Sequence, residues 1–141
     1  MELLEEAIPN MKIKRFEEIE AWQLARELTR KVYQLTNKGR FARDFRLKGQ
    51  IESASCSSMN NIAEGFDSDS NTEFIRFLRY SKRSCSEIQS ELYAALDQQY
   101  ITNAEFQDVY DFAGRTRAMI RGLIRYLLSC KNVKRSIAGN A

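Results

Sequence analysis

The sequence predicts an all-α protein, folded as an antiparallel up-down-up-down four-helix bundle. Four long segments repeat apolar residues every three or four positions, as amphipathic helices do. The 141 residues include one proline and six glycines, so few positions interrupt a helix. The stretches between the periodic segments are short, which places consecutive helices side by side in antiparallel order.

The first two helices are predicted at residues 17–37 and 43–64. Their apolar faces comprise Ala21, Leu24, Leu28, Val32 and Leu35 in the first, and Leu47, Ile51, Ala54, Ser58 and Ile62 in the second. Gly39 lies beyond the first helix and suits a helix stop, because glycine adopts a left-handed backbone without steric cost. Residues 53–61 are almost all small or polar, which favours a tight contact with another helix inside the bundle. A subunit contact or a ligand groove is the alternative.

The third and fourth helices are predicted at residues 71–97 and 103–130. The third has an apolar face of Phe74, Phe77, Ser81, Cys85, Ile88, Leu92 and Ala95. The fourth has Phe106, Val109, Ala113, Thr116, Ile120, Leu123 and Leu127 in a seven-residue repeat. Residues 1–15 and 131–141 lack a full amphipathic pattern. We therefore expect an N-terminal tail, a bundle over residues 16–130 and a basic C-terminal tail.

The segment between the second and third helices contains oxygen ligands at alternate positions, as a calcium loop does. Asp67, Asp69 and Asn71 have this spacing. Counted from Asp67, however, Thr72 and Leu78 stand where the loop requires a glycine and a bidentate glutamate. A metal site is therefore not expected here.

Turn chemistry explains this segment better. Gly65 suits the left-handed position after a helix, and Ser70 with Glu73 has the spacing of a capping box. Glu64 is the exception, because the helix dipole disfavours an acid in the last turn. We expect Glu64 to have a specific partner, such as an arginine, and its replacement by glutamine to lower stability.

The composition restricts the chemistry of the protein. The chain has no histidine, which excludes Ser-His-Asp and Cys-His catalysis and histidine-ligated zinc or di-iron sites. Cys56, Cys85 and Cys130 are far apart, which indicates buried, reduced thiols. Glu87 and Glu91 share a helix face but have no companion nucleophile, so paired-carboxylate hydrolysis has little support. We expect no enzyme activity, no catalytic residue, no metal and no cofactor.

The start of the chain, MELLEEAIPN, is acidic and lacks the basic start and apolar segment of a secretory signal. No apolar run approaches the ~20 residues that a membrane-spanning helix needs. We therefore expect a cytoplasmic protein with no membrane partner.

Charge is distributed unevenly along the chain, although the net charge is only +3. Residues 112–141 contain seven basic residues and no acid, whereas residues 84–111 contain six acids and no base. Antiparallel packing gathers the acids at the 98–102 turn and the bases at the opposite end. We expect this arginine-rich pole to bind RNA or DNA phosphates, with Tyr80 and Tyr126 as stacking groups. The candidate residues are Arg76, Arg79, Lys82, Arg83, Arg115, Arg117, Arg121, Arg125, Lys131, Lys134 and Arg135.

Two further features concern assembly. A second basic group, at the first turn, comprises Lys38, Arg40, Arg43, Arg46 and Lys48. The alternative to nucleic-acid binding is that the charges at both ends form solvated faces with salt bridges within and between subunits. The first and last helices also contain more large apolar residues than a lone bundle needs, namely Phe16, Ile19, Trp22, Met119, Ile124 and Leu128. This surplus predicts a homo-oligomer, because exposed apolar patches need cover.

Three stretches of the chain resemble one protein family. They are FEEIEAWQLARELTRKVYQLT at residues 16–36, QIESASCSSMNNIAEGF at 50–66 and EFIRFLRYSKRSCSEIQSELYAALDQQYI at 73–101. They are similar to the bacterial four-helix-bundle family, also called the ribosomal-RNA intervening-sequence proteins. That family includes the accessory variability-determinant proteins of diversity-generating retroelements. The matching structural signature residues are Trp22, Gln23, Asn61, Glu64 and Gly65, whereas Met59 stands where the family usually has a proline.

The resemblance implies a small antiparallel bundle without established catalytic residues. It also implies a ring-shaped homopentamer and, from the accessory members, contact with nucleic acid and a reverse transcriptase. We therefore expect a non-catalytic oligomer that binds or scaffolds RNA or DNA through the arginine-rich pole, with a reverse transcriptase or another protein as a further partner. The alternative is a purely structural protein–protein interaction module that binds no nucleic acid.

Overall fold

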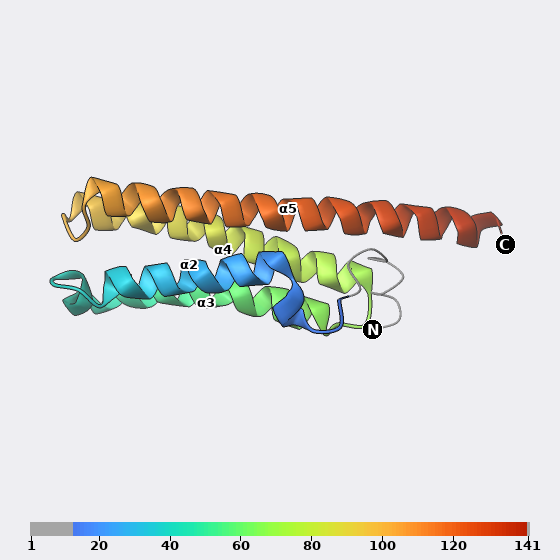
Figure 1. The fold of residues 1–141 in the computed structure, drawn as a ribbon, viewed down its shortest axis with the longest axis horizontal. Coiled ribbons are helices and arrows are strands. Elements are labelled where there is room, and N and C mark those ends of the chain that lie inside the picture. Colours follow the sequence, from blue (N-terminus) through green and yellow to red (C-terminus); the bar gives the residue numbers. More distant parts are fainter. Residues whose placement is uncertain (1–12, 141) are drawn as a thin grey trace.

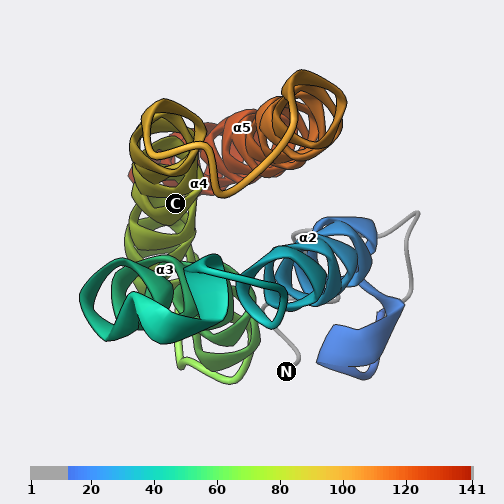
Figure 2. The same ribbon diagram turned by 90° about the vertical axis from the view of Figure 1, so that its left-hand side faces the viewer.

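The computed structural model describes residues 13–140, with side chains described for residues 13–130. Its helices are η1 (Phe16–Glu18), α2 (Glu20–Thr36), η2 (Phe41–Arg43), α3 (Phe45–Phe66), α4 (Asn71–Asp97) and α5 (Asn103–Asn140), and no strand occurs in this range. The α2–α3 hairpin lies along the α4–α5 hairpin (Figure 1). Viewed along the bundle, the long helices occupy four corners, with α2 diagonally across from α4 (Figure 2). The predicted four-helix bundle is confirmed.

The helix bounds agree with the predictions best in the middle of the chain. α4 has the predicted bounds, whereas α2 begins at Glu20 because residues 16–18 form the separate 3-10 turn η1. α5 continues to Asn140 and runs past the other helices (Figure 1). Residues 131–140, expected to be a tail, are therefore helical. Of the expected N-terminal tail, Ile13 is buried, and residues 1–12 lie outside the described part of the chain.

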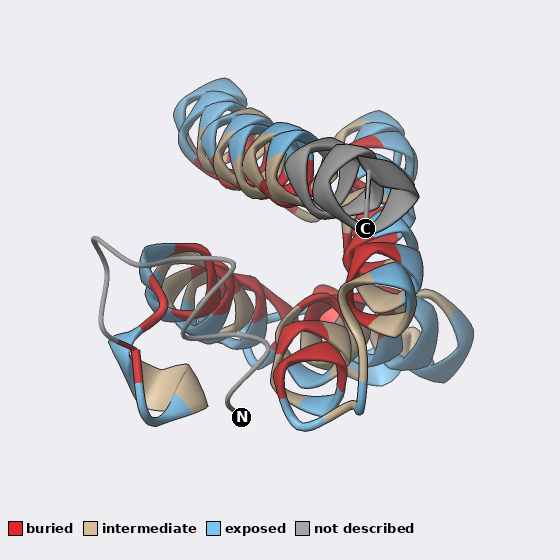
Figure 3. Cartoon of the chain, turned by 90° about the vertical axis from the view of Figure 1, so that its right-hand side faces the viewer, coloured by how far each residue is buried: buried red, intermediate tan, exposed pale blue. Residues whose placement is uncertain are grey.

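The buried residues of the long helices lie mostly on the sides that face the other helices (Figure 3). The largest fully buried side chains are Ile19, Leu28, Phe41, Ile51, Ile62, Phe74, Leu78, Ile88, Leu92, Ile120 and Leu127. They come from every long helix, from η2 and from Ile19 between η1 and α2, so the whole fold has one core. Burial of apolar surface, at about 25 cal/mol per Å², is the main term that holds the helices together.

Gly65 allows α3 and α4 to approach closely, and it is not the helix stop that the sequence predicts. α3 continues through Gly65 to Phe66, and among the described glycines only Gly39 has a positive φ, +52°. A Cβ atom on Gly65 would lie 2.8 Å from Phe74 Cδ1 and 2.8 Å from Phe77 Cβ. No side chain fits at that distance, so glycine is required here for packing. The predicted stop at Gly39 is confirmed.

Serine side chains continue this close contact along α3 and α4. The Ser81 hydroxyl donates to the Ser58 carbonyl at 2.5 Å, and Ser84 Oγ lies 3.2 Å from Ser57 Oγ. A serine is short enough to reach a neighbouring backbone only when the two helices nearly touch. The small residues at positions 53–61 therefore form the predicted contact inside the bundle.

Side-chain caps fix where α4 and α5 begin. Ser70 Oγ accepts from the Glu73 amide at 3.2 Å, as predicted, but the Glu73 carboxylate bonds to Arg76 at 2.7 Å. A box with both bonds stands at the start of α5. Thr102 Oγ1 accepts from the Glu105 amide at 3.1 Å, and Glu105 Oε1 accepts from the Thr102 amide at 2.9 Å. These bonds lower the pKa of Glu105.

The prediction that the surplus apolar residues leave exposed patches is wrong. The bundle itself buries Ile19, Trp22 and Ile124. The η1 turn folds against α2, where the Phe16 and Trp22 rings meet edge to face with centroids 5.1 Å apart. Phe16, Met119 and Leu128 also pack partly against the core. The exposed large apolar residues of the described range are instead Tyr33, Phe45 and Tyr93.

Two ion pairs join α2 and the turn after it to the first part of α5, near the 98–102 turn. Lys31 Nζ lies 3.0 Å from Asp108 Oδ2, and Lys38 Nζ lies 3.6 Å from Glu105 Oε2. Both pairs are partly exposed, so each contributes at most about 1 kcal/mol. They nevertheless fix which ends of the first and last helices meet.

Replacing Gly65 with alanine is expected to lower the free energy of unfolding by about 1–3 kcal/mol, because the added methyl group overlaps Phe74 and Phe77. Urea denaturation measures this change. Gly49→Ala in the same helix is the matched control, since nothing lies within 4 Å of its added Cβ. The control should gain about 0.5–1 kcal/mol from helix propensity. Equal effects at the two positions would contradict the packing role of Gly65.

Candidate nucleic-acid interface

A basic groove lies between α4 and α5. It is lined by Lys82 and Ser86 from α4 and by Arg117 and Arg121 from α5, and its volume is about 390 Å³. Residues four apart lie on the same side of a helix, so antiparallel packing brings the two pairs face to face. Arg117 Nη1 donates to Ser86 Oγ at 3.0 Å and joins the two walls. We refer to these four residues as the basic groove.

The basic groove contains three cationic side chains and no acidic one. Lys82 and Arg117 are partly buried, and Arg121 is exposed. None of the three forms an ion pair with a residue that the structure describes. Neighbouring like charges without counter-charges raise the electrostatic potential in the groove, so it favours an anionic ligand.

Tyr80 belongs to α4 but lies two residues from Lys82, and therefore on another side of the helix from the basic groove. Two arginines lie at its ring. Arg83 Cζ lies 4.9 Å and Arg76 Cζ lies 5.8 Å from the ring centroid. Arg76 Nη1 also lies 3.4 Å from the Tyr80 hydroxyl, and the Phe77 ring meets Tyr80 edge to face. Tyr80 therefore positions two arginines, and it does not line the basic groove.

Arg115 and Tyr126 lie elsewhere, in an apolar groove between the start of α2 and α5. This groove has a volume of about 480 Å³ and is lined by Ile19, Glu20, Ala21, Arg115, Ala118, Met119, Gly122, Leu123 and Tyr126. The Arg115 guanidinium lies 5.9 Å from the Phe112 ring centroid. The structure thus separates Arg115 and Tyr126 from the other candidates.

The remaining candidates extend this basic region along the same helices. We refer to the basic groove together with Arg76, Arg79, Arg83 and Arg125 as the basic surface. Arg79 and Arg125 are exposed, and within residues 13–130 neither has a polar partner. Of the candidates with described side chains, only Arg76 forms an ion pair, at 2.7 Å from Glu73. Lys131, Lys134 and Arg135 belong to α5, but their side chains lie outside the described residues.

The second basic group, at the first turn, has mainly structural contacts. Lys38 pairs with Glu105, and Lys48 Nζ lies 2.9 Å from Glu52 Oε2. Arg40 Nη2 donates to the Gln98 carbonyl at 3.0 Å. These cations hold the connections between helices, whereas the cations of the basic groove lack such partners.

The sequence profile of a known family matches most of this fold. A profile described as 23S rRNA-intervening sequence protein matches residues 17–122. The chain belongs to this family. The matched range contains α2, α3, α4 and the part of α5 that lines the basic groove. A comparison with curated proteins finds no match.

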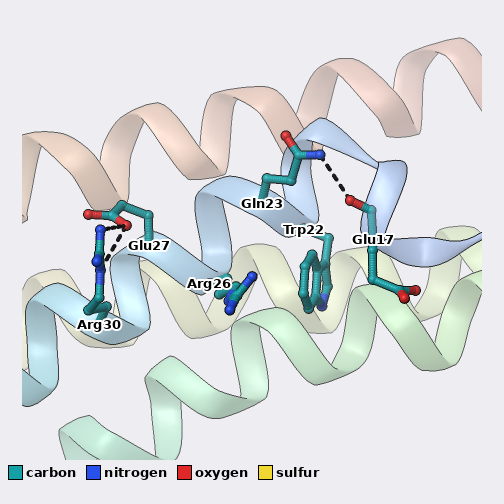
Figure 4. Close-up of a pocket in the computed structure, with 6 residues that line it drawn as sticks. All are labelled: Glu17, Trp22, Gln23, Arg26, Glu27 and Arg30. Carbon is teal, nitrogen blue, oxygen red and sulfur yellow. Dashed lines mark hydrogen bonds and ion pairs between the residues drawn. The ribbon is translucent and has the colours of Figure 1, made fainter.

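Two of the residues taken as the intervening-sequence family signature attach η1 to α2. Gln23 Nε2 donates to the Glu17 carbonyl at 2.9 Å, and Trp22 is buried beside Arg26, whose Cζ lies 5.8 Å from the indole centroid. They line a polar hollow of about 530 Å³ together with Glu17, Arg26, Glu27 and Arg30 (Figure 4). Trp22 and Gln23 therefore have a structural role that the sequence did not specify.

The other signature residues lie near the end of α3. Asn61 Nδ2 donates to the Ser57 carbonyl at 2.9 Å, one turn earlier in the helix. Gly65 allows the contact with α4. Glu64 is exposed and has no ion pair or hydrogen bond with the described part of the chain. The expected arginine partner of Glu64 is therefore absent from the described residues.

Glu91 is the acid whose environment the sequence did not reveal. Burial raises its pKa to about 7, and the charge of Glu87 and a hydrogen bond with Glu87 add to this shift. Glu91 Oε2 is buried and has no hydrogen-bond partner. The two acids share a helix face, as predicted, and their proximity favours the protonated form of Glu91.

The cysteines and the acids form no further chemical site in the range that the structure describes. Cys85 is buried, and burial raises its pKa to about 12, which keeps it a thiol. Cys56 and Cys130 are partly buried, and none of the three cysteines forms a disulfide within residues 13–130. Among the described residues, acids and cysteines do not gather in groups of three or more suited to a metal, and no helix there is long and apolar enough to cross a membrane.

Glu91 should make stability depend on pH. Its folded-state pKa of about 7 lies above the ordinary value of 4.5, so folding favours the protonated form. The contribution of Glu91 to stability should be fully present below pH 4.5 and be lost as the pH rises through about 7. Glu91→Gln should therefore be more stable than the natural protein at pH 8, by about 1–2 kcal/mol after allowance for partial exposure, and similar at pH 4.5.

Thermal or urea unfolding across this pH range measures the difference. Glu64→Gln is the matched control, because Glu64 is exposed and unpaired among the described residues. The control should raise the free energy of unfolding by less than Glu91→Gln does at pH 8, since it only removes an acid that the helix dipole disfavours in the last turn of α3. A Glu91→Gln variant that is less stable at pH 8 would show that the Glu91 carboxylate has a stabilising partner.

Proposed function

We propose that this protein is a non-catalytic, cytoplasmic binding protein that holds RNA or DNA on the surface formed by α4 and α5. The observation that carries the proposal is the contrast between its two basic groups. Lys38 and Lys48, at the first turn, have acidic partners within the fold. Lys82, Arg117 and Arg121 converge on one groove without any. Unpaired cations that converge on a groove suit an external polyanion better than internal structure.

The chemistry of the basic groove suits a phosphate group. Arg117 and Arg121 offer planar guanidinium N–H groups that match phosphate oxygens, and Lys82 adds a mobile ammonium. Ser86 Oγ accepts from Arg117, so its own O–H is left to donate to a phosphate oxygen. Binding there would release the counterions condensed on the nucleic acid, which supplies most of the free energy of such complexes.

Neutralising the groove should weaken binding in a salt-dependent way. Lys82→Gln or Arg121→Gln should reduce affinity for RNA and DNA and lower the slope of log K against log salt by about one each. Fluorescence anisotropy from 50 to 300 mM salt measures both quantities. Arg46→Gln is the matched control, because Arg46 is exposed at the far end of the bundle and has no ion pair with a described residue. Equal losses for Arg46→Gln and Arg121→Gln would refute a localised site.

A second candidate function is protein assembly, and the apolar groove favours it. Met119, Leu123 and Tyr126 line this groove with few polar groups beside them. We propose that a second copy of the chain covers it in a homo-oligomer, with a pentamer as the expected size. A reverse transcriptase or another protein as further partner remains part of this proposal. If assembly is the sole function, the charges serve subunit contacts and the protein binds no nucleic acid.

Light scattering at micromolar concentration should give a mass several times that of one chain. Ala118→Glu should reduce this mass, because Ala118 is exposed and lines the apolar groove, where a buried charge is costly. Ala104→Glu places the same side chain on an exposed site in the first turn of α5 and is the control. A monomeric natural protein would rule out the homo-oligomer, and an unchanged Ala118→Glu mass would place the interface elsewhere.

A further inference from the structure

We propose that the basic surface binds the sugar–phosphate backbone of a double helix, and that it does not bind the bases of a single strand. This inference rests on the proposed nucleic-acid function and specifies its ligand. Proteins that hold single strands combine cations with aromatic rings on which successive bases stack. Proteins that hold duplexes need only reach phosphates and sugar hydroxyls. The positions of the aromatic rings therefore separate the two classes of ligand.

The basic surface offers no free aromatic ring among its described residues. None of the four residues that line the basic groove is aromatic. Tyr80, on another side of α4, has Arg76 and Arg83 at its ring and Phe77 at its edge. Tyr126 lies in the apolar groove. Base stacking, a main source of affinity for single strands, is therefore missing from the basic groove.

The exposed aromatic residues are found at the other end of the bundle. Phe45 begins α3, and Tyr93 lies in the last part of α4, where it packs on Phe106 and Tyr110. The charged residues there are mixed, with Asp97 and Asp111 near Tyr93 and with Arg43 and Arg46 near Phe45, and none of them lines the basic groove. These rings therefore do not assist the basic groove.

Three cations of the basic surface are held in position, which suits a stiff ligand. Arg117 is tied to Ser86 across the two helices. Arg83 and Arg76 are held against Tyr80, and Arg76 is also bonded to Glu73. A single strand would lose conformational entropy on such an array without stacking to offset it, whereas a duplex backbone is already ordered.

The test compares a duplex with a single strand of the same length and composition, in RNA and in DNA, at one salt concentration. The natural protein should bind each duplex about tenfold more tightly than the corresponding single strand, since single-strand binding lacks stacking. Tyr80→Leu should weaken duplex and single-strand binding by similar factors, because it loosens Arg76 and Arg83. Arg121→Gln should weaken duplex binding, and Arg46→Gln should not.

Three results would overturn the inference. Single strands that bind as tightly as duplexes would contradict it while leaving nucleic-acid binding in place. A loss on Tyr80→Leu confined to single strands would show that Tyr80 stacks on bases. Absence of binding to either form would refute the proposed function and the inference together. An equal preference for RNA and DNA duplexes supports a phosphate contact, and a preference for RNA adds a contact with the 2′-hydroxyl.

Discussion

The close contact between α3 and α4 is the constraint on which the rest of the structure depends. Gly65 brings α4 to the surface of α3, and the Ser81 hydroxyl then reaches the Ser58 carbonyl two turns further along. Together they fix the rotation of α4 about its own axis. That rotation turns Phe74 and Leu78 into the core and leaves Lys82 and Ser86 beside α5. The basic groove is thus a consequence of how tightly two other helices pack.

The cations near the 98–102 turn and those in the middle of the bundle have different partners. Near the 98–102 turn, cations of the first half of the chain meet acids of α5, and these pairs close the fold. Along the middle of α5, Arg117 and Arg121 face cations of α4 and gain no acid from the fold. The net charge of the chain does not reveal this difference. It follows from which helix faces meet, so it is a property of the three-dimensional arrangement.

The sequence predicted the parts of the structure that local chemistry controls. The bounds of α4 follow from the Ser70 cap and the apolar period, and the stop at Gly39 follows from backbone conformation. Gly65 was misassigned because a glycine near a helix end serves equally as a stop or as a packing site. The apolar surplus was misassigned because only the folded position of η1 shows that Trp22 is buried.

The candidate site could be predicted in part. Arg117 and Arg121 recur every four residues, so their common side was visible in the sequence. Arg115 lies two residues from Arg117 and therefore on another side of α5, a separation that helix period alone shows. The occupation of Tyr80 by two arginines, and the pKa of Glu91, depend on packing and on burial that no spacing encodes.

The ion pairs of Lys31 and Lys38 link the C-terminal part of α2 and the turn after it to the first part of α5. At the opposite end of the contact between these two helices lies the apolar groove. Local opening between α2 and α5 is therefore expected to be easiest at the apolar groove and hardest near Lys31 and Asp108. Salt screens these ion pairs, so ionic strength affects how closely α2 and α5 stay together as well as the binding of any phosphate.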